Sequence, residues 1–119
     1  MIIIRNSAWT MYFKYFKSKG NVRCKGKYIF LSKLELELYR LMEEYFKDYG
    51  FFSAKISTRD CRVDGDFVLC LNFQDDSQYQ ELRKRFPVNY NKDDVRFCGW
   101  KSDKDTFDKI YSNNFLNAR

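Results

Sequence analysis

The amino-terminal quarter of the chain combines cations with aromatic rings. Its first 34 residues contain eight Lys or Arg side chains and no Asp or Glu. The remaining 85 residues hold 14 basic and 16 acidic side chains, so the excess positive charge is confined to one end of the sequence. Cationic groups neutralise phosphates, and flat rings stack on bases. The pattern therefore favours contact with a polyanion that carries stackable rings, which is the chemistry of a nucleic acid.

Two segments could make this contact. The first is a basic hairpin over residues 10–27, with its cations on one face and a ring free to stack. The second is the basic cluster 83–85, at the expected carboxyl end of a helix, where the helix dipole alone already favours cations. The alternative for the hairpin is that its rings are core and its lysines only keep it soluble. The candidate nucleic-acid-binding residues are Lys14, Lys17, Lys19, Arg23, Lys25, Lys27, Tyr12, Phe16, Arg83 and Arg85.

Aspartates offer a different kind of chemistry. Asp64, Asp66 and Asp75 lie at the ends of a predicted strand, and nucleases gather carboxylates of this kind around Mg²⁺. Turns and helix amino termini also select Asp for local hydrogen bonds, which explains these positions without a metal. A magnesium-dependent nuclease is therefore the third of our functional hypotheses.

Other catalytic chemistry finds little support in the residue types. The chain has no histidine, which excludes Ser-His and Cys-His pairs and histidine-based metal sites. The four cysteines, at positions 24, 61, 70 and 98, are too widely spaced for a zinc half-site. We expect Cys24, Cys70 and Cys98 to be small core residues of strands. The sequence predicts no catalytic residue, no metal and no cofactor.

Length and composition indicate one domain over residues 1–119. Hydrophobic residues make up 45% of the chain, enough for a core of its own. No apolar run approaches the roughly 20 residues of a membrane helix, and residues 1–5 are too short for a signal peptide. We expect an intracellular protein in a reducing compartment. Few Ala and Pro beside many Lys, Asn, Phe and Tyr point weakly to an AT-rich coding sequence, as in viruses and mobile elements.

The elements that position these residues begin with a predicted hairpin over residues 9–31. Residues 9–17 alternate as a strand, although a helix also fits their aromatic spacing. Residues 18–21 form a turn, and residues 22–31 alternate with Tyr28 and Phe30 on one face and Lys25 and Lys27 on the other.

The body of the domain, residues 32–119, contains helices and strands in turn. Ser32 and Glu35 form a capping box for a helix over 32–49 with Leu34 and Leu38 on its inner face. Strands follow at 51–60 and 66–73, joined by a two-residue turn at Asp64-Gly65. The last elements are a helix over 76–86 capped by Asp75 or a neighbouring residue, a strand over 95–100, and a helix from 102 or 103 to 115.

From residue 27 onward this is the order of a ferredoxin-like, or split βαβ, fold. We therefore expect an α+β domain whose antiparallel sheet carries helices on one face, with the N-terminal β-hairpin before it and a C-terminal helix after it. If residues 88–90 pair with 95–97, the body gains one more strand.

Three functions remain open. The first is a small non-catalytic nucleic-acid-binding protein, for DNA or RNA. The second is a protein-interaction or inhibitor module, whose partner is a nucleic-acid-handling enzyme or a second copy of the chain in a homodimer. The third is the nuclease. The charge asymmetry favours the first of them.

Overall fold

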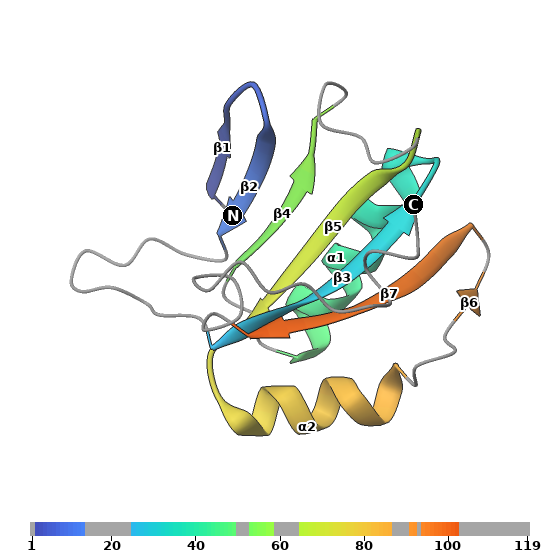
Figure 1. Ribbon diagram of the computed structural model, residues 1–119. Helices are drawn as coiled ribbons and strands as arrows, with labels where there is room; N and C mark the ends of the chain where they lie inside the picture. The colour runs from blue at the N-terminus through green and yellow to red at the C-terminus, as the bar shows by residue number, and fades with distance from the viewer. Residues whose placement is uncertain are drawn as a thin grey trace.

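The computed structural model of the chain describes residues 2–13, 25–49, 53–58, 65–86, 91–92 and 94–102. Within these ranges, seven strands form one antiparallel sheet in the order β1-β2-β4-β5-β3-β7-β6 (Figure 1). The strands are β1 (Ile2–Arg5), β2 (Trp9–Phe13), β3 (Gly26–Ser32), β4 (Ser53–Ser57), β5 (Phe67–Phe73), β6 (Asn91–Lys92) and β7 (Val95–Ser102). The helices of the described residues are α1 (Glu35–Tyr49) and α2 (Asp76–Arg85). Neither of them combines the length and apolarity that crossing a membrane requires.

The predicted ferredoxin-like sheet with a separate N-terminal hairpin is wrong. The strand β2 does not pair with residues of the predicted strand 22–31; it pairs with β1 on one side and with β4 on the other. The strand β3 lies between β5 and β7 instead. The described part of the domain is thus dominated by one broad sheet, which absorbs the strands expected in the hairpin and gains β1 and β6.

The composition of β3 explains why it is a central strand. The prediction assigned one face of this segment to cations alone, but Ile29 and Leu31 share the face of Lys27 and are buried. Tyr28 and Phe30, on the other face, are also buried. A strand that is apolar on both faces needs cover on both faces, so it pairs on both edges rather than forming an exposed ribbon.

The larger of two hydrophobic clusters lies on the face of the sheet that carries α1. The helix packs over β3, β4 and β5, and side chains of α2 join the same cluster. Aromatic rings make up much of it, with Phe30 and Phe86 in an edge-to-face contact at 4.7 Å between centroids. The buried members include Tyr12, Tyr28, Phe30, Leu38, Met42, Tyr45, Leu69, Leu71, Phe73, Leu82 and Phe86.

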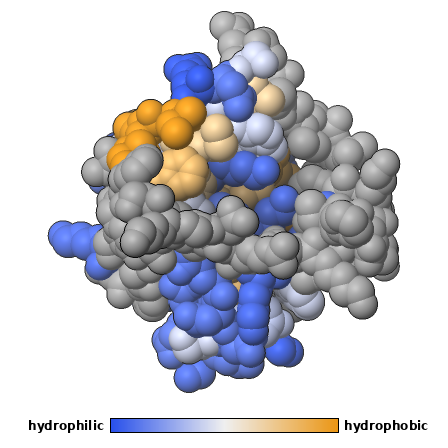
Figure 2. Space-filling view, turned by 90° about the vertical axis from the view of Figure 1, so that its left-hand side faces the viewer, coloured by the Kyte–Doolittle hydropathy of each residue, from blue (hydrophilic) through white to orange (hydrophobic). Residues whose placement is uncertain are grey.

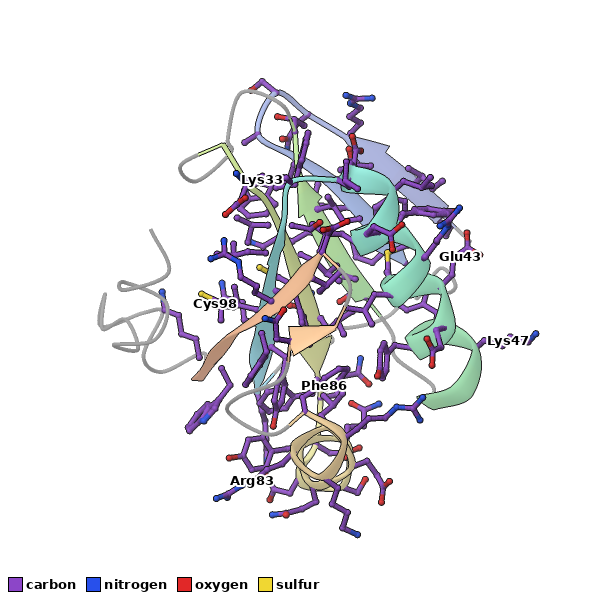
Figure 3. All side chains as sticks on the ribbon, turned by 90° about the vertical axis from the view of Figure 1, so that its right-hand side faces the viewer. Lys33, Glu43, Lys47, Arg83, Phe86 and Cys98 are labelled. Atoms are coloured by element: carbon purple, nitrogen blue, oxygen red, sulfur yellow. The ribbon has the colours of Figure 1, made fainter. Side chains whose placement is uncertain are left out.

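The smaller cluster lies on the opposite face of the sheet. It contains Ile29, Leu31, Val68, Cys70 and Cys98. Trp9, on the same face, packs against it as a partly buried ring. Figure 3 shows Cys98 on the side of the sheet away from α1. The prediction of strand core positions is confirmed for Cys70 and Cys98, whereas Cys24 lies outside the described residues.

The first helix is confirmed, but its amino end differs from the prediction. The chain remains in β3 up to Ser32, and α1 begins at Glu35. The Ser32 hydroxyl oxygen accepts a hydrogen bond from the Leu34 amide at 3.0 Å. Leu34, expected on the inner face, is 49% exposed, while Leu38 is fully buried. The residues up to Ser32 are in the strand and not in the helix because β3 pairs with both of its neighbours as far as Ser32.

The two strands predicted after the first helix are confirmed as β4 and β5. The strand β5 lies in the middle of the sheet and is buried on both faces. Its register with β4 places Ile56 opposite Leu69. The turn predicted at Asp64-Gly65 includes Asp64, which lies outside the described residues; Gly65 itself has a positive φ of 83°. The helix 76–86 is confirmed as α2, with the Asp75 carboxylate accepting from the Gln78 amide at 2.9 Å.

The last described strand, β7, is longer than predicted and carries a bulge. Its register with β3 shifts between Ile29 and Phe30, opposite Gly99 and Phe97 respectively. Gly99 has a φ of 128°, which a residue with a side chain rarely adopts. The short strand β6 pairs with Val95 and Arg96, so the additional pairing considered for residues 88–90 falls on residues 91–92 instead. The predicted helix after residue 102 lies outside the described residues.

Candidate nucleic-acid interface

Three lysines gather on the face of the sheet that is turned away from α1. Lys27 of β3 and Lys101 of β7 are direct cross-strand partners. Lys55 of β4 is opposite Cys70, and Cys70 is opposite Ile29, two positions along β3 from Lys27. Partners across strands and residues two apart within a strand share a face, so the three side chains lie on one side of the sheet. We call Lys27, Lys55 and Lys101 the lysine cluster.

The bulge in β7 is the reason that Lys101 belongs to the cluster. In an uninterrupted strand, residues alternate between faces, and Lys101 would share a face with Phe97. Phe97 packs in the hydrophobic cluster below α1, however, and the register shift places Trp100 opposite Tyr28 on that face. Lys101 is thereby turned to the opposite face, beside Lys27. The bulge therefore determines on which face of the sheet the Lys101 side chain lies.

The electrostatic environment of Lys55 is unfavourable for its charged form. Burial is the main cause that lowers the pKa of Lys55; Cys70 opposes it, and the positive charges of Lys27 and Lys101 each lower the pKa by a smaller amount. Burial raises the pKa of the Cys70 thiol in spite of the three lysines around it. Like charges directly opposite each other on a sheet destabilise it. An anion bound to the cluster would relieve this repulsion.

Lys55 also interacts with an aromatic ring. Its ammonium nitrogen lies 4.3 Å from the centroid of the Trp9 ring, which is cation–π geometry. Trp9 is opposite Ser57 in the β2–β4 register, two residues along β4 from Lys55. The indole thus holds one lysine of the cluster in a defined position on the face.

Several cations outside the cluster are paired with carboxylates. The exposed pair of Lys25 with Asp76 measures 3.3 Å, and Arg85 contacts Glu44 of α1 at 2.7 Å. Lys84 and Arg40 pair within their own helices, and Arg96 pairs with the buried Asp66. Within the described ranges, by contrast, Lys27 and Lys55 form no ion pair. These two members of the lysine cluster therefore have no carboxylate partner in the part of the chain that the structure describes.

The predicted binding residues fall into three groups. Lys14, Phe16, Lys17, Lys19 and Arg23 lie outside the described residues, so their positions stay a prediction. Lys25 and Lys27 are described, at the start of β3 and within it. Tyr12, Arg83 and Arg85 are described but lie away from the lysine cluster.

Tyr12 belongs to the core and not to a stacking surface. It is 6% exposed, and its ring makes an edge-to-face contact with Tyr39 of α1 at 5.7 Å. Burial is the main cause of its raised pKa. The alternation of β2 turns Tyr12 toward α1, so a stacking role on the opposite face is a correction to the sequence-based list.

The basic end of α2 lies on the other side of the sheet from the lysine cluster. Leu82 and Phe86 of this segment pack in the cluster below α1, and Arg85 also lies 5.6 Å from the Tyr45 ring. Figure 3 shows Arg83 on α2, at one end of the sheet. Arg83 and Arg85 therefore do not extend the surface formed by Lys27 and its neighbours.

The chain between β2 and β3 starts and returns at the end of the sheet where the cluster lies. Phe13, the last residue of β2, is opposite Ser53, and Ser53 is opposite Asn72. Asn72 is in turn opposite Lys27. Lys25 continues directly into β3 and donates its backbone N–H to Phe73 at 2.8 Å. The described residues on either side of this segment, Phe13 and Lys25, therefore both lie at the end of the sheet that contains Lys27.

Sequence reasoning missed two lysines of this face, Lys55 and Lys101, of which Lys101 is only 4% exposed. Trp100 is 43% exposed, the one aromatic ring in the exposed class among the described residues. It lies opposite Tyr28 on the face of α1, not on the face of the lysine cluster, and meets Tyr79 edge-to-face at 5.5 Å. The signal for Lys55 was present, since a lone lysine in an otherwise uncharged strand stands out. No signal in the sequence reveals the bulge between Phe97 and Gly99 that sets the faces of Trp100 and Lys101.

The aspartates considered for a metal are not brought together. Asp66 precedes β5 and pairs with Arg96, whereas Asp75 follows β5 and caps α2. They therefore lie at opposite ends of that strand, and Asp64 lies outside the described residues. Among the described side chains, no group of three or more potential ligands is placed to hold a metal ion. One oxygen of Asp66 is buried without a hydrogen-bond partner.

Comparisons of the chain with protein-family models, with curated proteins and with solved structures find no match.

Proposed function

We propose that the protein binds nucleic acid without catalysis, through the lysine cluster and the basic segment that joins β2 to β3. The observation that carries the proposal is that Lys27 and Lys55, which form no ion pair in the described residues, share a face with Lys101. Keeping three cations on one sheet face costs stability through mutual repulsion. A phosphate backbone compensates this cost, because each neutralised phosphate also releases condensed counterions.

The charge of the whole chain supports the same partner. The net charge is +6 at pH 7, and its excess resides in the segment that includes Lys27. Such a field raises the rate of encounter with a polyanion and makes the affinity depend on salt. Because the contacts would be to phosphates, they carry little sequence information, and we expect weak sequence preference.

A salt titration with a fluorescently labelled oligonucleotide tests the proposal. The logarithm of the association constant should fall linearly with the logarithm of salt concentration. Lys27→Ala should reduce the magnitude of the slope by about one. Lys47→Ala is the matched control, because it removes the same charge from the outer side of α1 (Figure 3). No binding at low salt, or equal effects of the two variants, would contradict the proposal.

A further inference from the structure

The strand β1 forms one edge of the sheet and is exposed on both faces. Ile3 is 57% exposed and Ile4 is 49% exposed. Ile3 is opposite Tyr12 and so faces the side of α1, while Ile4 is opposite Met11 and faces the side of the lysine cluster. Figure 2, which views the molecule from the side where β1 lies, shows a hydrophobic patch there. Among the exposed large hydrophobic residues of the described ranges, Ile3 and Ile4 are the two that belong to an edge strand.

Along β1, the backbone N–H and C=O groups of successive residues point alternately toward β2 and toward the outer edge of the sheet. The Asn6 N–H donates to the Trp9 carbonyl at 2.9 Å, so the pair formed by these two residues is a hydrogen-bonded one. In an antiparallel ladder, hydrogen-bonded pairs alternate with non-bonded ones. Ile2 and Ile4 therefore bond to β2, and the N–H and C=O groups of Ile3 and Arg5 point to the outer edge.

The two edges of the sheet are protected to different degrees. At one end, β6 has two residues, Asn91 and Lys92, and a short edge with a charge resists further pairing. At the other end, β1 has four residues, no proline and one charge, Arg5, at its last position. An apolar edge with free backbone groups is a template for another strand.

We propose that β1 pairs with β1 of a second copy of this chain, antiparallel and around a two-fold axis at Ile4. In this register Ile3 of each copy is opposite Arg5 of the other, and the pairs exchange four backbone hydrogen bonds, which uses every outward group of the two residues. Ile4 meets its own counterpart on the lysine side of the sheet. The two seven-stranded sheets become one continuous sheet.

The distribution of charge favours this register over its neighbours. Pairing in parallel, or shifted so that Arg5 is opposite itself, would place like charges side by side, which is destabilising. With the axis at Ile4, the aliphatic part of each Arg5 side chain covers Ile3 of the other copy while its guanidinium stays in water. The partner is thus the chain itself, because the same four residues supply both halves of a complementary edge. The contact is small, so the dimer is concentration dependent.

Sedimentation equilibrium over a wide range of chain concentration tests the association. The wild-type protein should shift from monomer to dimer as concentration rises. Ile4→Lys should remain monomeric, because it places two ammonium groups at the two-fold axis. Leu36→Lys is the matched control, since Leu36 is an exposed leucine of α1 with a similar exposed fraction. Far-UV circular dichroism on both variants verifies that they fold.

Disulfide trapping tests the register. Residues of a non-hydrogen-bonded antiparallel pair have Cα atoms about 4.5 Å apart, within the range that a disulfide spans. In a background with Cys24→Ser and Cys61→Ser, Ile4→Cys should form a covalent dimer under mild oxidation, and Ile3→Cys should not. A wild-type protein that stays monomeric at all concentrations, or an Ile4→Lys variant that dimerises like the wild type, would overturn the proposal. Preferential cross-linking of Ile3→Cys would overturn the register.

Discussion

The ammonium nitrogen of Lys55 lies 4.3 Å above the ring of Trp9, next to the facing pair formed by Lys27 and Lys101. Lys55 therefore makes one favourable contact, with Trp9, in an electrostatic environment that disfavours its positive charge. Desolvation and the two neighbouring lysines all lower its pKa. A residue of this kind is expected where stability is sacrificed for a binding surface.

Replacing Lys55 by methionine should stabilise the protein at neutral pH. The wild-type lysine has a folded-state pKa below its ordinary value of 10.5. Its charged form therefore destabilises the fold at neutral pH, and this penalty disappears as the pH rises from the folded toward the unfolded pKa, where the unfolded chain binds more protons. Lys55→Met should raise the urea midpoint at neutral pH, and its advantage should shrink in the alkaline range. Methionine retains a contact with the indole.

The control for this variant is Lys47→Met, which removes an exposed lysine of α1 and should leave the midpoint almost unchanged. Oligonucleotide affinity of Lys55→Met should fall while its stability rises. A less stable Lys55→Met protein at neutral pH would mean that the contact with Trp9 outweighs desolvation and repulsion.

Asp75 should make the stability of the protein sensitive to acid. Its carboxylate accepts from the Ser77 hydroxyl at 2.6 Å and from the Gln78 amide at 2.9 Å, and these hydrogen bonds lower its pKa. The folded pKa is thus below the ordinary value of 3.8, so the contribution is present above that value and is lost as the pH falls through the folded pKa.

The measurement compares urea midpoints across the acid range for the wild type and two variants. Asp75→Asn keeps an acceptor for the helix terminus and should lose the pH dependence that Asp75 causes. Asp75→Ala should be less stable at neutral pH as well. Asp94→Asn, at an exposed turn, is the control with the same change of charge. Identical pH profiles for Asp75→Asn and the wild type would contradict the role of the carboxylate.

Leu69→Ala should lower the free energy of unfolding by about 2–5 kcal/mol. Leu69 is fully buried in the centre of β5, between β3 and β4. Leu36→Ala removes the same atoms from a side chain that is 56% exposed and should change stability by less than about 0.5 kcal/mol. Chemical denaturation of both variants provides the comparison, and similar losses would show that β5 does not occupy the centre of the core.

Cys70 and Cys98 should resist alkylation in the folded protein. Burial raises the pKa of the Cys98 thiol to about 11 and that of Cys70 as well, so little reactive thiolate is present at neutral pH. Mass spectrometry after a short exposure to iodoacetamide should find both unmodified, and the same treatment in urea should modify them. Rapid labelling of Cys70 without denaturant would mean that the small hydrophobic cluster opens easily.

Local patterns predicted most of the individual elements. The helical spacing of Leu38 and Met42 predicted α1, the apolar residues on both faces of segment 66–73 predicted β5, and Asp75 marked the start of α2. These elements depend on neighbours a few residues away, which a sequence displays directly. The run of three isoleucines at residues 2–4 also has strand character, but it is too short to stand out.

Pairing between strands could not be predicted in the same way. The partners of β2 are Ile2–Arg5 and Ser53–Ser57, and nothing in its five residues distinguishes them from β3. The lysine cluster depends on this pairing, because its members are 28 and 46 residues apart in the chain. The bulge at Gly99 added a second obstacle, since one shifted residue exchanges the faces of Trp100 and Lys101.

The central position of β3 also determines the order in which the domain can be completed. Its two neighbours, β5 and β7, both come later in the chain, and β7 is the last strand that the structure describes. During synthesis β3 therefore emerges with two open edges, and one of them stays open until residues 95–102 have left the ribosome. Closing so long a loop is entropically slow, so a nascent chain that stalls before β7 exposes an aggregation-prone strand.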